Sequence, residues 1–260
     1  MRCRLALILL LSPGCGRLDA VSNLADPVVA QGLFLGLDVP EAYVDDLAST
    51  EEFQYAALCN VFLAYVADPS ELANAPVGGA VLTFRSPANG ALTFREALGD
   101  EGEVTGKYTL DSSDGLVYEV GDTPAISFTI DGAEARLEVL APESPDVELP
   151  GSFERESPLE VDLSDYAYQN AVAAAYDIDR GRMTWDNLPT AVDEVYEFTH
   201  TEEPIEFLEI PAEAFLRKST YVVGVAGMEV ADPLSFEGVN TSVSAFLAGQ
   251  LAVGLVVVTE

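Results

Sequence analysis

Two short acidic clusters are the candidates for metal chemistry in this chain. Asp111 and Asp114 lie just before a glycine, and so do Asp177 and Asp179. Oxygen side chains at such close spacing are the ligands that calcium prefers. Neither cluster continues into a twelve-residue EF-hand loop with its closing Glu, and acidic residues next to glycine also form ordinary turns. The sequence favours ordinary turns at both clusters, and the four aspartates remain candidates for calcium ligands as the alternative.

The chain has few of the His and Cys residues that other metal sites and nucleophilic catalysis require. The chain has one His, His200, and three Cys, so a zinc site built from several such ligands is set aside. A triad around His200 would need a nucleophile and an orienting acid, and no Gly-x-Ser-x-Gly elbow is present. We expect no enzyme and no cofactor, with an unrecognised hydrolase that uses carboxylates near His200 as an alternative.

The charge balance excludes one class of partner. The chain has 44 acids against 12 Lys and Arg, a net charge of −32. Phosphate affinity comes mainly from Lys and Arg, so a nucleic-acid binder with a basic surface is excluded. The stretch 193–213 has eight acids and no Lys or Arg, and it reads as a solvated acidic edge or as a docking surface for a basic partner.

The first residues have the pattern of an export signal. Arg2 and Arg4 precede the apolar run Leu5–Leu11, and small or turn-forming residues follow before Cys15. Seven apolar residues cannot cross a bilayer core, which needs about 20 in a helix. This pattern resembles a bacterial lipoprotein lipobox, which implies that residues 1–14 are removed and that Cys15 is lipidated. The resemblance implies anchoring in the cell outer membrane, with periplasmic or secreted protein as the alternative.

Removal of the signal changes the meaning of the cysteines. Cys3 would leave with the signal and Cys15 would carry lipid, so Cys59 alone remains and no intramolecular disulfide is possible. Cys59 lies in the alternating stretch 53–66, which predicts a small core side chain rather than a reactive thiol.

Period-two patterns dominate the rest of the chain and predict an all-β fold, with two β-sandwich modules in series after a short tether. The predicted organisation is a signal peptide over 1–14, a tether with a short helix after Asp38 over 15–52, a first sandwich over 53–142, a Pro- and acid-rich linker over 143–157 and a second sandwich over 158–260. The clearest predicted strands are Thr109–Val120, Ala125–Ile130, Ala135–Leu140 and Tyr221–Val225, with hairpin turns at Asp114-Gly115 and Asp131-Gly132.

Short motifs in the two units resemble known sandwich families. Pro76–Val81, followed by Gly106–Leu110, resembles the carboxypeptidase regulatory-like, prealbumin-type sandwich. Met183–Pro189 and Thr220–Val225 resemble strands of fibronectin type III or immunoglobulin-like domains. The second resemblance implies that Trp185 packs in the core and that the hydroxyl of Tyr221 bonds a neighbouring turn.

The last 22 residues before Glu260 leave two interpretations. Residues 238–259 contain no charge and are long enough to cross a bilayer. Polar residues and glycines inside the stretch favour a buried hairpin instead, with Ala248–Gln250 as the turn between Val243–Leu247 and Leu251–Val258.

The expected function is a non-enzymatic, lipid-anchored envelope protein with a structural or adhesive role, bound to an envelope protein or a glycan. A carbohydrate- or calcium-binding accessory module is the alternative.

Overall fold

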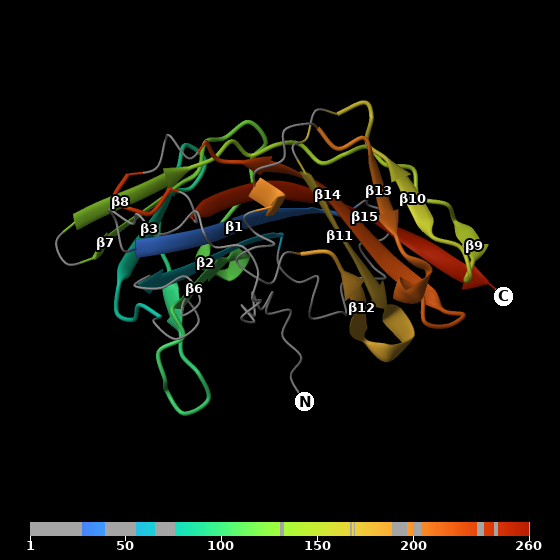
Figure 1. The fold of residues 1–260 in the computed structure, drawn as a ribbon, viewed down its shortest axis with the longest axis horizontal. Coiled ribbons are helices and arrows are strands. Elements are labelled where there is room, and N and C mark those ends of the chain that lie inside the picture. The colour runs from blue at the N-terminus through green and yellow to red at the C-terminus, as the bar shows by residue number, and fades with distance from the viewer. Residues whose placement is uncertain are drawn as a thin grey trace.

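The computed structural model describes residues 28–39, 56–65, 76–130, 133–166, 168, 170–188, 197–199, 204–232, 237–241 and 244–259. Strands form nearly all of the regular structure, which confirms the all-β prediction (Figure 1). Within the described ranges three short 3₁₀ turns accompany them, η5 (Ser112–Asp114), η6 (Ile178–Arg180) and η7 (Ala212–Ala214).

One nine-stranded sheet runs through the whole molecule. Its order is β12-β11-β14-β15-β1-β2-β6-β5, and β9 adds to the far end of β15. Strands β1 and β15 pair in parallel at its centre, and most of the other pairs are antiparallel. The strands are β1 (Val28–Asp38), β2 (Ala57–Tyr65), β5 (Arg95–Ala97), β6 (Lys107–Asp111), β9 (Ser152–Glu154), β11 (Asn170–Asp177), β12 (Arg182–Asp186), β14 (Thr220–Val230) and β15 (Ala245–Thr259).

Two smaller sheets cover one face of this main sheet and create two cores. The four-stranded sheet β4-β3-β7-β8 covers β1, β2, β6 and the start of β15, where Phe34, Phe84 and Phe246 are buried. The two-stranded sheet β10-β13 covers β11, β14 and the end of β15, where Tyr221 and Val256 are buried. The strands of these sheets are β3 (Val81–Ser86), β4 (Gly90–Thr93), β7 (Ala125–Ile130), β8 (Ala133–Glu138), β10 (Leu159–Asp162) and β13 (Phe207–Ile210).

The two lobes are joined more closely than the sequence predicts. Residues 28–38, expected within the tether, form β1, and its first nine residues are all buried. β1 pairs with β2 of the first lobe and with β15, which also pairs with β14 of the second lobe. The lobes therefore share one continuous sheet rather than meeting through a linker alone.

The predicted C-terminal hairpin is wrong. Residues 245–259 form the single strand β15, and the proposed turn around Gly249 lies within it. A Cβ at Gly249 would lie 2.4 Å from the Met228 sulfur, and one at Gly254 would lie 2.8 Å from Leu149, so these glycines allow close packing instead of a turn. In the described part of the chain no helix has the length and apolar character to cross a bilayer.

Several local predictions are confirmed. β7 has the predicted bounds, and Ile130 pairs with Ala133 across Asp131-Gly132, as expected of a hairpin. Tyr221 Oη donates to the Arg217 carbonyl at 3.1 Å, which is the predicted bond to a neighbouring turn. Cys59 is fully buried in β2, and burial raises the pKa of its thiol well above the ordinary value. Trp185, predicted to lie in the core, is only partly buried and packs against the edge of the second core.

Candidate functional site

The first acidic cluster caps a turn. β6 ends at Asp111, whose side chain accepts the Ser113 amide at 2.8 Å while Asp114 accepts the Asp111 amide at 3.1 Å. Arg95 Nη2 lies 2.6 Å from Asp111 and 2.8 Å from Asp114. Burial alone raises the pKa of Asp111, but the bonds from Ser113 and Arg95 outweigh it and lower the pKa. The strand predicted over Thr109–Val120 therefore ends at Asp111. The capped 3₁₀ turn follows it, in place of the predicted hairpin turn at Asp114-Gly115.

The second cluster, in the other lobe, also lies at the end of a strand and also pairs with an arginine. β11 ends at Asp177, whose side chain is fully buried and accepts Arg217 Nε at 2.9 Å and Nη2 at 3.2 Å. Ser219 Oγ lies 2.9 Å from both Asp177 Oδ1 and Asp179 Oδ2. Burial again raises the pKa of Asp177, and the bonds from Arg217 and Ser219 lower it overall.

All four calcium candidates thus lie next to an arginine. Asp179 is the most distant, at 3.8 Å from Arg217 Nη2. Within the ranges that the structure describes, no three His, Cys, Asp or Glu side chains gather as a metal site would require. Calcium at either cluster stays a prediction, and it would have to compete with a guanidinium that already neutralises the carboxylates.

Two tyrosines mark the junction between the lobes. The ring of Tyr118 lies against Gly36 of β1, where a Cβ would be 2.4 Å from it, and stacks on Phe34 with ring centroids 4.8 Å apart. The ring of Tyr168 lies against Gly227 of β14, where a Cβ would be 2.2 Å from it. Only glycine lets a ring pack this closely on a strand.

The two tyrosines hold the first residue of the predicted linker and the residue just before it. Tyr118 Oη donates to the carbonyl of Pro142 and Tyr168 Oη donates to that of Glu143, each at 2.8 Å. Burial raises the pKa of both phenols far above the ordinary value, so they remain protonated donors. Ser144 adds two contacts, from its amide to Gln250 Oε1 at 3.2 Å and from its hydroxyl to Asp38 at 2.9 Å. The start of the 143–157 segment is therefore fixed to the main sheet.

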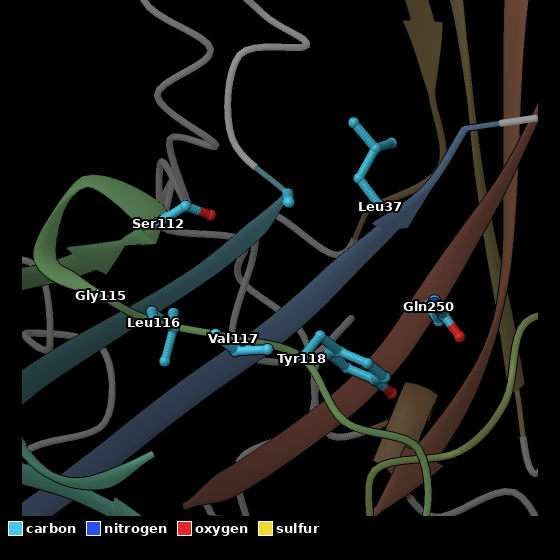
Figure 2. A pocket seen from close by; sticks show the side chains of 8 residues that line it. Leu37, Ser112, Gly115, Leu116, Val117, Tyr118 and Gln250 are labelled. Atoms are coloured by element: carbon cyan, nitrogen blue, oxygen red, sulfur yellow. The ribbon is translucent and has the colours of Figure 1, made fainter. Parts of the chain in front are cut away.

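A pocket of about 330 Å³ lies beside this junction (Figure 2). Tyr118 and Gln250 contribute to its wall, as does Ser112, whose hydroxyl accepts the Ala57 amide at 2.8 Å. None of the lining side chains is charged. The lining residues are Leu37, Ala56, Ser112, Gly115, Leu116, Val117, Tyr118 and Gln250.

Gln250 is the polar group of this pocket with spare hydrogen-bonding capacity. Its Oε1 accepts the Ser144 amide, which fixes the orientation of the side-chain amide. Its Nε2 group donates to none of the residues that the structure describes. The arrangement can bind a small neutral molecule, and sequence reasoning missed it. The available signal was an isolated glycine within a strand, such as Gly36, which indicates close approach by another group.

The remaining predicted site residues lie outside the described part of the chain. Cys15 and His200 are among them, as are the helix after Asp38 and residues 193–196 and 200–203 of the acidic stretch. No protein-family model matches the chain, and no curated protein is significantly similar to it.

Proposed function

We propose that this protein is a non-enzymatic component of the bacterial cell envelope, anchored to the outer membrane by lipid on Cys15, with a structural or adhesive role. The residues around Cys15 and the charged, apolar and small-residue segments before it support export and lipidation. The partner would be an envelope protein or a glycan rather than nucleic acid.

One observation carries the structural part of this proposal, namely the main sheet that both lobes share. β15 pairs with β1 over its first half and with β14 over most of its length, so neither lobe can rotate without breaking central strand pairs. The bonds from Tyr118 and Tyr168 to Pro142 and Glu143 fix the crossing segment as well. Such a body holds surfaces on the two lobes in a fixed orientation relative to each other.

The aspartate clusters fit this role better than catalysis. Asp111 and Asp177 each cap a turn and each pair with an arginine, which keeps their pKa values low. A carboxylate that acts as a general acid or base needs a pKa near the working pH. These carboxylates stabilise the ends of β6 and β11.

Metabolic labelling with a fatty-acid analogue tests the anchor. We expect the wild-type protein to be labelled and Cys15→Ser to lose the label. Cys59→Ala is the matched control, because it removes the buried cysteine and should leave labelling intact. Equal labelling of Cys15→Ser and wild type would refute the anchor.

A second candidate function is a carbohydrate-binding accessory module, and the pocket favours it. A charged ligand would have no counter-charge in the lining and would lose its hydration, which is unfavourable. An aromatic ring, aliphatic walls and the amide side chain of Gln250 suit a neutral sugar, whose ring offers an apolar face and hydroxyl acceptors. The volume lies near the lower limit of about 300–1,000 Å³ for small-molecule sites, which limits the ligand to one or two sugar rings.

Calorimetry against a panel of neutral and anionic sugars, with calcium as a separate titrant, tests this candidate. We expect heat of binding from a neutral sugar and its loss in Gln250→Leu. Thr129→Val is a control, because Thr129 is exposed on β7 and does not line the pocket. A flat response to every sugar would remove the carbohydrate candidate, and a flat calcium titration would remove the calcium candidate.

A further inference from the structure

We infer that the central pair β1–β15 acts as a mechanical clamp, so that the protein carries tensile load along its strands. The inference rests on the proposed function in one respect, because the proposed lipid anchor on Cys15 decides where tension enters the protein. Cys15 precedes β1 in the sequence, so tension from an anchor there reaches the described structure at Val28.

The direction of the two strands determines how they are loaded. β1 and β15 are parallel, with Gln31 opposite Ala245 and Asp38 opposite Ala252. β15 continues to Thr259 at the far end of the second lobe, along the long axis of the molecule (Figure 1). A load applied between Val28 and the far end of β15 would therefore pull the two strands past each other lengthwise.

Lengthwise pulling loads the strand pairs together. The hydrogen bonds of a parallel pair are evenly spaced along the strands and run across them. Displacing β1 by one residue, about 3.3 Å, breaks all of its pairs at once, whereas pulling neighbouring strand ends apart breaks pairs one after another. β1 has eight paired residues on the β15 side and nine on the β2 side, so both of its edges resist this displacement.

Side-chain packing adds a steric obstacle to sliding. Gly32 lies beneath the ring of Phe246, where even a Cβ would be 2.7 Å away. Tension at Val28 would move Phe34 toward the place that Gly32 occupies, where no side chain fits. On the opposite face Leu33 and Leu35 are buried in an apolar cluster with Leu247, so the strand is held by packing on both sides.

Single-molecule force spectroscopy on the chain without its proposed signal, carrying Cys15→Ser, tests the clamp. In the lengthwise geometry, handles are attached at the N-terminus and at the C-terminus. In the unzipping geometry, handles are attached at the C-terminus and at Lys218→Cys, an exposed position next to Thr220, which pairs with Val257. Cys59 is fully buried and does not compete for the handle.

We expect the first rupture in the lengthwise geometry to need a several-fold higher force than the first rupture in the unzipping geometry. Urea unfolding of the Lys218→Cys chain, compared with the chain that keeps Lys218, confirms that the attachment site leaves equilibrium stability unchanged, so that any difference in force comes from the loading path. Equal or lower force in the lengthwise geometry would overturn the clamp. This outcome leaves the lipid anchor intact, while equal labelling of Cys15→Ser would refute the anchor and leave the force result intact.

Discussion

Asp177→Asn is the substitution whose effect follows most directly from the geometry. It keeps the shape of the side chain but removes the charge that faces Arg217, at 2.9 Å and 3.2 Å. The Asp177 side chain is fully buried, so water cannot replace the lost interaction, whereas about a third of the Arg217 side chain is exposed and can be rehydrated. Hydrogen bonds to charged groups contribute about 1.5–3 kcal/mol each, and partial rehydration of Arg217 leads us to expect a loss of about 2 kcal/mol.

The pH dependence of this loss has a definite sign. The pKa of Asp177 is lower in the folded protein than the unfolded value of about 3.9, so its contribution is complete above that value. The contribution is lost as the pH falls through the folded pKa. The difference in unfolding free energy between wild type and Asp177→Asn should therefore be constant from about pH 7 to pH 5 and shrink below about pH 4.

Urea unfolding followed by the fluorescence of Trp185 measures this difference, because Trp185 is the single tryptophan and packs against the core of the same lobe. Glu138→Gln is the matched control. Glu138 faces Arg136 at 2.5 Å, but both side chains are more than two-fifths exposed, and exposed pairs contribute about 0.2–1 kcal/mol. A loss for Asp177→Asn no larger than that for Glu138→Gln, or one that does not shrink at acid pH, would refute the reasoning.

Other predictions concern the junction, the free thiol and the surface charge. Gly227→Ala should lose about 1–3 kcal/mol of stability by thermal unfolding, because its Cβ would lie within the ring of Tyr168, whereas Gly151→Ala, with nothing within 4 Å, should lose none. Tyr118→Phe should lose about 1 kcal/mol, since the carbonyl of Pro142 loses its donor. Cys59 should react with a thiol reagent only in denaturant, and reaction of the native protein would contradict its burial. With a net charge of −32, the melting temperature should rise with NaCl through the sub-molar range, because salt screens repulsion over about 8 Å at physiological ionic strength. A flat or falling melting temperature would contradict this.

The sequence was informative where structure depends on neighbouring residues. The alternation in 125–130 predicts β7 to the residue, and the turn residues after it predict the hairpin with β8. The hydroxyl of Tyr221 bonds Arg217 only four residues away, so the strand motif was sufficient to predict the contact.

The sequence was uninformative where structure depends on distant residues. β1 has apolar residues on both faces and therefore lacks the alternation that marks a strand with one exposed face. Its parallel partner β15 lies more than two hundred residues away. Gly249 resembles a turn residue in the sequence, but it makes room for Met228. The junction and its pocket follow from these distant pairings, which is why no local pattern identified them.

The pairing of β1 with β15 also determines when the protein can fold. β1 is synthesised early, but its parallel partner is among the last strands to be made, and β14, which lies on the other side of that partner, is also late. The centre of the sheet therefore cannot close before β15 has been made, and contacts of such long sequence separation form slowly. Under the proposed export this delay would be useful, because the central pair stays open until β15 has been made.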